Sequence, residues 1–222
     1  MTLSPQSMRA GWRDVFHARL LSGAQYASSH ELPWVEPSTM VPKRLIPYSQ
    51  AKHTDDFNQW VCFYEDDHKF IADVWRNPSR ALQIVRRFEG AISPDFSMYR
   101  DMPLILQEYA VFMNRATEYY WQKNGVQVIP NVRWGDQRTH EIACAGIPRC
   151  STIAIGSYGA LRDRSNRQYL LAGVSYVAKT LQPEKVIVYG GTPPAMVESF
   201  TSVGAQIVRI ATAAENAHKK AA

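Results

Sequence analysis

The feature that most constrains this chain is an alternation of short apolar runs with segments of helical length, which continues from about residue 45 to residue 210. Each run is long enough for one buried strand, and the segment after it can hold a helix that crosses over to the next strand. This alternation is typical of a mostly parallel sheet with right-handed crossovers. We predict strands at 45–46, Trp60–Tyr64, Ala91–Ser93, Val126–Val132, Thr152–Ile155, Lys185–Tyr189 and Gln206–Ile210.

The predicted fold class is therefore α/β, built from repeated strand–helix units. Such units form either a reduced (β/α) barrel-like closure or an open doubly wound sheet. Periodicity does not separate the two arrangements, and we favour the barrel-like one. Residues typical of helix starts support the same units. These starts are Asn77 with Pro78, Pro103, Ser165 as a cap, and Thr192 with Pro193; the first two helices end near Phe88 and at Asn124-Gly125.

The region before this pattern is organised differently. Apolar residues recur at every fourth position from Met8 to Leu20, which predicts a helix over 5–22 that Gly23 ends. Four prolines between residues 24 and 59 indicate an extended arm. We therefore expect an N-terminal helix and Pro-rich arm at 1–44 packed on the body, an α/β domain at 45–212 and a C-terminal tail at 213–222.

Composition indicates an ordinary globular protein, because 45% of the 222 residues are apolar and 20% are charged. The three cysteines show neither a CxxC pair nor zinc-finger spacing. No stretch approaches the roughly 18 consecutive apolar residues of a membrane span. The first residues also lack the charged-then-apolar order of a signal peptide. We expect a cytoplasmic protein with no membrane partner.

Acidic side chains follow three of the predicted strands, at the strand ends where this fold class binds ligands. Asp66 and Asp67 follow the strand at 60–64, Asp95 the next and Asp136 the one after. Because neighbouring strands lie about 5 Å apart, we expect these carboxylates to approach one another. They would suit a general acid with a general base, or a divalent cation such as Mg²⁺. The alternative is that each acid only caps a helix or forms a turn.

Other residues near the same edge suit a phosphate-bearing ligand. The net charge is +5, and arginine is concentrated between residues 133 and 167. We expect Asn131 to orient a substrate, Trp134 to stack on it, and Arg133 or Arg138 to neutralise its phosphate.

The Gly190-Gly191-Thr192 turn before a helix could bind an anion through backbone N–H groups, or serve as a plain turn. There is no Walker lysine and no GxGxxG, so nucleotide cofactors of those two types are not supported.

Four phrases occur in order along the chain: FYEDD at 63–67, SPDFS at 93–97, VIPNVRWG at 128–135 and VYG at 188–190. With them the chain resembles the domain of unknown function 4417 family, which is found in bacteria, phages and mobile elements. The resemblance runs from about Pro47 to Ala211. It implies a phage or mobile-element context and no established activity.

Two classes of function remain open. The first is an enzyme acting on a nucleotide or nucleic-acid phosphate, with Asp66, Asp67, Asp95 and Asp136 as acid, base or metal ligands. The alternative is a non-catalytic accessory factor that binds nucleic acid or a host protein. If the acids crowd together, Asp95→Asn relieves repulsion, so we expect stability to be unchanged or raised while activity is lost.

Overall fold

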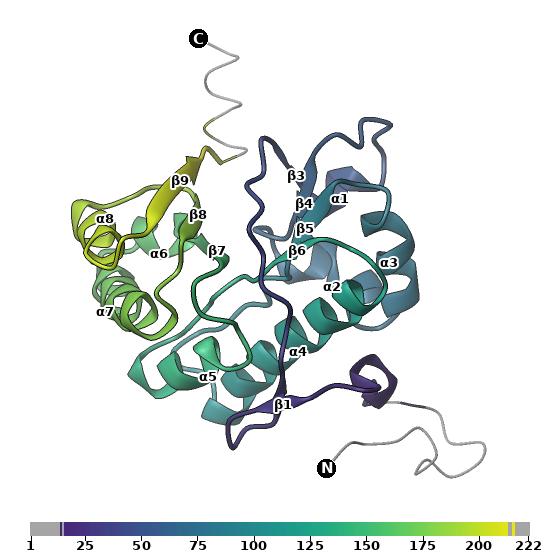
Figure 1. The fold of residues 1–222 in the computed structure, drawn as a ribbon, viewed down its shortest axis with the longest axis horizontal. Coiled ribbons are helices and arrows are strands. Elements are labelled where there is room, and N and C mark those ends of the chain that lie inside the picture. Colours follow the sequence, from purple (N-terminus) through teal and green to yellow (C-terminus); the bar gives the residue numbers. More distant parts are fainter. Residues whose placement is uncertain (1–13, 15, 213–214, 216–222) are drawn as a thin grey trace.

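A computed structural model describes residues 14, 16–212 and 215, and within them a run of parallel strands forms the centre of the molecule (Figure 1). Four strands pair in the order β3-β4-β5-β6 and three in the order β7-β8-β9. A single parallel bridge between Asn131 and Ala154 links the two groups. The α/β fold class is therefore confirmed. The strands are β3 (Leu45–Pro47), β4 (Trp60–Cys62), β5 (Gly90–Ile92), β6 (Val128–Ile129), β7 (Thr152–Gly156), β8 (Lys185–Tyr189) and β9 (Gln206–Ile210).

The sheet is open, since no ladder joins β3 to β9 among the described residues. The favoured barrel-like closure is therefore absent, and an open layout fits. The strands still follow one another in chain order, and their inner faces pack into one cluster that includes Trp60, Ile129 and Ile187. Leu45 from β3 and Val208 from β9 pack against this cluster. The two sheet groups thus share one inner core without closing.

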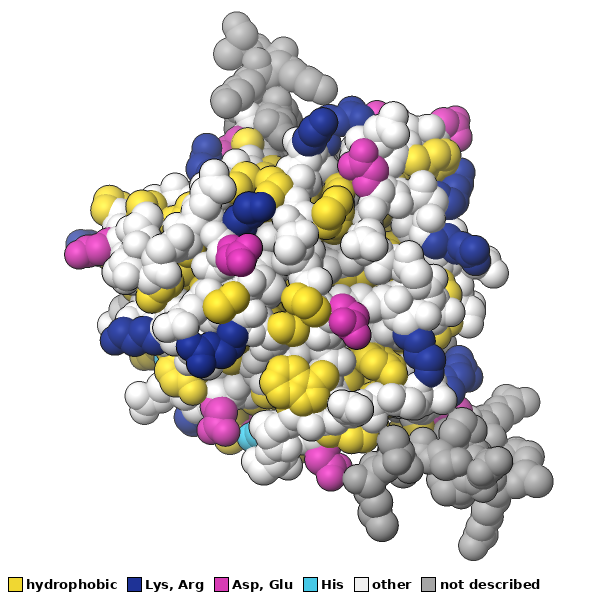
Figure 2. Space-filling view, viewed as in Figure 1, with side chains coloured by type: hydrophobic (Ala, Val, Ile, Leu, Met, Phe, Trp, Pro, Cys, Tyr) yellow, Lys and Arg dark blue, Asp and Glu magenta, His cyan; other side chains and the backbone are white. Residues whose placement is uncertain are grey.

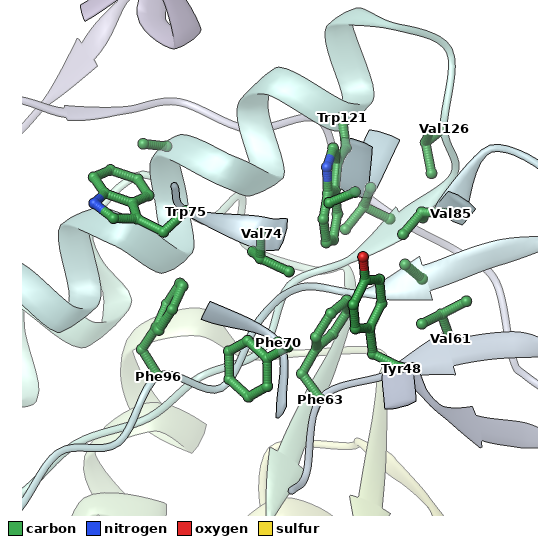
Figure 3. Close-up of a cluster of buried hydrophobic side chains, with 14 of the residues drawn as sticks. Tyr48, Val61, Phe63, Phe70, Val74, Trp75, Val85, Phe96, Trp121 and Val126 are labelled. Carbon is green, nitrogen blue, oxygen red and sulfur yellow. The ribbon is translucent and has the colours of Figure 1, made fainter. Parts of the chain in front are cut away.

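Helices cover the outer faces of the strands and form two further apolar cores. The core under β3–β6 is rich in aromatic rings (Figure 3). There the Phe63 ring stacks on Tyr48 at 5.2 Å and lies 5.4 Å from Trp121 of the longest helix. The helices are α1 (Tyr48–Ala51), α2 (Ile71–Val74), α3 (Pro78–Val85), α4 (Leu104–Lys123), α5 (His140–Cys144), α6 (Tyr158–Arg162), α7 (Arg164–Leu181) and α8 (Pro194–Thr201), with 3-10 turns η2 (Ala18–Leu21), η3 (Asp67–Lys69) and η4 (Gln137–Thr139).

Two predicted helix caps are wrong in detail. Ser165 lies inside α7, and its N–H donates to the carboxylate of Asp163, which is the cap. Thr192 does not cap α8, because the residue before that helix is Pro193. The starts predicted at Asn77 and Pro103 are correct, since these residues directly precede α3 and α4. Strand β6 is shorter than predicted, because Pro130 has no N–H to donate to a ladder.

The N-terminal arm packs against the amino ends of the strands. It forms a short antiparallel pair, β1 (Tyr26–Ala27) with β2 (Leu32–Pro33), and then runs extended along the body (Figure 1). Thr152 at the start of β7 donates its N–H to the Ser38 carbonyl at 2.6 Å, and Lys185 at the start of β8 donates to the Thr39 carbonyl. The arm therefore lies at the edge opposite the carboxyl ends. Most of the predicted helix over 5–22, and the tail apart from residue 215, lie outside the described residues.

Candidate functional site

A cleft of about 900 Å³ opens at the carboxyl ends of the strands. Its walls come from the ends of β4, β5, β6, β7 and β8 and from the helices that follow β7. This is the edge at which parallel α/β sheets place their ligands, and the volume is in the range of small-molecule sites. Side chains on the wall include Tyr64, Asp66, Asp95, Tyr99, Arg100, Arg133, Trp134, Asp136, Tyr158, Asn166, Tyr169 and Tyr189.

The floor of the cleft holds a buried acid fixed by two neighbours. Asp95 follows β5 and is only 8% exposed. Its Oδ2 accepts from Arg133 Nη1 at 2.6 Å, and its Oδ1 accepts from Asn131 Nδ2 at 2.8 Å. Burial raises the pKa of the Asp95 carboxyl, while Arg133 and Asn131 oppose the rise. The result is a carboxylate with fixed orientation and raised pKa, at a place that a ligand can reach.

Tyr64 fixes the orientation of the Asn131 amide. Its hydroxyl donates to Asn131 Oδ1 at 3.0 Å, so the amide nitrogen faces Asp95. Burial raises the pKa of Tyr64 well above its ordinary value, so the hydroxyl keeps the proton that it donates. The Tyr64 ring stacks on Tyr189 from the end of β8, with centroids 4.8 Å apart. Gly156 makes this possible, because a Cβ there would lie 2.8 Å from the Tyr64 ring.

A second polar layer lies behind this floor, on α4. Asn131 donates its backbone N–H to Ser93 Oγ at 2.7 Å. Burial raises the pKa of Glu118 on α4, although Arg115 opposes the rise. Glu118 is itself paired with Arg115 at 2.6 Å, and both side chains are almost fully buried. Burying such a pair is costly, and Arg115 also donates to the carbonyls of Ala143 and Ala145.

Three of the four predicted acids, Asp66, Asp95 and Asp136, line the cleft, but the four do not form one cluster. Asp66 is exposed and lies 3.8 Å from Lys69, whereas Asp67 accepts from the N–H and hydroxyl of Ser97. Asp136 accepts from the backbone and side chain of Arg138, and these bonds lower its pKa. Although β4, β5 and β6 are neighbours, each acid has its own partner: Asp66 and Asp136 a residue of the same loop, and Asp67 and Asp95 a residue of the next loop. In the part of the chain described, no three His, Cys, Asp or Glu side chains could hold a metal together.

The predicted substrate-binding residues are divided in the same way. Asn131 and Arg133 lie at the floor beside Asp95. Trp134 lines the cleft, but its Nε1 donates to the Tyr169 carbonyl at 3.0 Å. Arg138 is an exposed side chain that joins Asp136 to the Arg100 carbonyl.

The Gly190-Gly191-Thr192 turn is not part of the cleft wall. The N–H of Gly190 donates to the Ile210 carbonyl, and the Gly191 carbonyl accepts from Ser157 Oγ. Pro193 and Pro194 follow, and neither has an N–H to offer. The turn therefore has few backbone donors for an anion.

Sequence reasoning missed several residues that complete the site. Tyr64 and Tyr189 are the last residues of two predicted strands. Site residues were expected mainly in the loop after each strand, so these two tyrosines were not predicted. Ser93 was placed in a strand without a role.

Comparison with known proteins gives a consistent result. The family model described as Domain of unknown function (DUF4417) matches residues 24–207. Two curated proteins, each called Gene 1 protein, are 30% identical over 187 residues, which is 83% of this chain. One is from Mycobacterium phage D29, where the match covers 68% of its length, and the other from Mycobacterium phage L5, where it covers 80%. No solved structure matches. Among the described helices, none has the length and apolar character needed to cross a membrane.

Proposed function

The chain belongs to the domain of unknown function 4417 family, and we propose that it is an enzyme that acts on a nucleotide or nucleic-acid phosphate bound in the cleft. Its phage relatives favour a phage or mobile-element context. The proposed proton-transfer group is Asp95. Arg133 would contact the substrate phosphate from the same floor.

The observation that carries this proposal is the fixed Asp95–Arg133 pair. A carboxyl with a raised pKa is better placed to exchange a proton near neutral pH than an exposed one. Arg133 uses Nη1 for Asp95, while its buried Nε has no hydrogen-bond partner among the described residues. The Arg133 side chain is 28% exposed, so its remaining N–H groups can donate to a phosphate oxygen.

Aromatic rings around this pair suit the rest of a nucleotide. Tyr99 and Tyr158 line the cleft with exposed rings, and a base can stack on such faces. A divalent cation held by three protein side chains does not fit, since no such group of His, Cys, Asp or Glu forms within the described range. The proposed chemistry therefore uses the protein's own side chains.

A different observation favours the alternative of a non-catalytic factor that binds a host protein. The first turn of α4 exposes Leu104, Ile105 and Leu106 beside a second groove of about 320 Å³. Exposed apolar patches of this kind mark many protein interaction sites. Replacing Ile105 and Leu106 by Ser would test this candidate without touching the cleft.

The enzyme proposal is tested by binding and turnover together. Nucleoside mono-, di- and triphosphates at millimolar concentration should raise the melting temperature of the wild type. Phosphorus NMR of the same mixtures would report turnover. We expect Asp95→Asn to bind and not turn over, and Asp66→Asn, which changes an exposed acid of the same cleft, to behave as wild type. No stabilisation by any nucleotide, or turnover by Asp95→Asn at the wild-type rate, would contradict the proposal.

A further inference from the structure

One rim of the cleft carries exposed arginines beside an exposed aromatic ring. Tyr158 begins α6 and is 41% exposed, and the Arg162 guanidinium lies 5.4 Å from its ring centroid. Arg164 and Arg167 follow on the first turns of α7, next to the wall residue Asn166. All three arginines are exposed, and none forms an ion pair with another described residue. The rim therefore places three exposed arginines beside a stacking surface, with the carboxylate of Asp163 among them.

The loop after β5 adds a second aromatic ring and a further arginine to the cleft. Tyr99 is 60% exposed, and Arg100 after it places its guanidinium 4.0 Å from the Tyr169 ring centroid. The same guanidinium donates to Asn166 Oδ1, which connects the loop after β5 to α7 beside the cleft. Acidic groups nearby are partly occupied, since Asp163 accepts from Ser165 and Asn166.

We propose that the ligand of this cleft is a single-stranded nucleic acid, with one nucleotide on the floor and its neighbours on the aromatic and arginine rim. The inference rests on the proposed function and narrows its substrate class. Interleaved aromatic rings and arginines are typical of sites that bind single strands, because bases stack on the rings and the arginines contact the backbone phosphates.

The depth of the site selects a single strand over a duplex. Asp95 is 8% exposed at the floor, so a paired base inside a double helix cannot reach it without leaving its stack. The volume of about 900 Å³ admits a small ligand and not the width of a duplex. Elsewhere, charges of both signs are interspersed over the face in Figure 2, which shows no large basic area for a double helix.

The test measures binding by fluorescence anisotropy with a labelled ten-nucleotide thymidylate strand, and compares it with thymidine monophosphate and a duplex of equal length. We expect the strand to bind at least tenfold tighter than either competitor. The triple variant Arg162→Gln, Arg164→Gln, Arg167→Gln should weaken strand binding at least tenfold, and weaken the mononucleotide much less. The log–log slope of its affinity against salt should fall by about 2, because each phosphate that a cation neutralises on a single strand contributes about 0.7.

The matched control removes the same charge away from the cleft, with Lys43→Gln, Arg76→Gln and Arg86→Gln, which also change exposed side chains. It should bind the strand nearly as well as wild type. Equal affinity for strand and mononucleotide, equal losses in both triple variants, or a duplex that binds as tightly as the strand would overturn the inference and leave the proposed function standing. If neither the mononucleotide nor the strand binds, both this inference and the proposed function are wrong.

Discussion

Arg133 and Asp95 form an ion pair at the floor of the cleft, with Nη1 2.6 Å from Oδ2. The two residues are 38 positions apart and follow the neighbouring strands β6 and β5. Asp95 therefore faces an opposite charge, and not the crowd of acids that the strand ends predicted.

This pair reverses the direction that the sequence predicted for Asp95→Asn. The substitution leaves Arg133 without its counter-charge and places an amide NH₂ group against a donor. We expect the free energy of unfolding to fall by about 1–3 kcal/mol, because the pair is partly buried. Urea denaturation at pH 7 measures the change, with the exposed Asp66→Asn expected to match wild type. Unchanged or increased stability in Asp95→Asn would show that repulsion from other acids outweighs the attraction between Asp95 and Arg133.

The buried ion pair of Arg115 with Glu118 gives a larger expected loss of stability. Glu118→Gln removes the counter-charge of Arg115 in the core, so we expect about 3–5 kcal/mol of destabilisation. The exposed pair of Arg44 with Asp56 is the control, and Asp56→Asn should cost no more than about 1 kcal/mol. Equal losses in both variants, measured by urea denaturation, would show that burial does not strengthen the first pair.

Replacing each of two helix glycines by alanine should have opposite effects on stability. A Cβ on Gly173 of α7 would overlap Trp134 Nε1, which donates to the Tyr169 carbonyl. Gly173→Ala should therefore cost about 1–3 kcal/mol and change the tryptophan fluorescence. Gly159 of α6 has open space around its Cβ position, so Gly159→Ala should be neutral or stabilise by up to about 1 kcal/mol. A harmless Gly173→Ala would argue against tight packing at Trp134.

The lowered pKa of His140 predicts that the protein loses stability in mild acid. Burial lowers its pKa below the ordinary 6.5, although Asp136 opposes the shift, and its Nε2 has no partner among the described residues. Because the unfolded chain binds the proton more readily, neutral His140 contributes fully to stability above about pH 6.5. This contribution to the free energy of unfolding is lost as pH falls through the pKa of His140 in the folded protein.

The measurement compares wild type with His140→Gln at pH 7.5 and pH 5.0 by urea denaturation. The wild type should lose more stability between these two pH values than the variant. Comparison with the variant is needed because burial also lowers the pKa of His17. Parallel losses in both proteins would assign the pH dependence to other groups.

The candidate site shows where sequence reasoning succeeds. Asp95, Asn131 and Arg133 were predicted as site residues from their positions after strands, and the structure brings all three together. Strand position decides this, since neighbouring parallel strands end at one edge. Asp67 and Asp136 were predicted by the same argument, but neither joins the Asp95 pair, because Asp67 accepts from Ser97 and Asp136, on the cleft wall, accepts from Arg138.

The sequence by itself determined the parallel α/β fold and most of its strands, because strand and helix periods and proline or glycine punctuation are local properties of the chain. Only the tertiary structure decided that the sheet stays open, that Tyr64 stacks on Tyr189, and that Asn131 donates its N–H to Ser93. These are contacts between residues far apart in sequence. Each depends on how strands and helices pack against one another, which periodicity along the chain does not record.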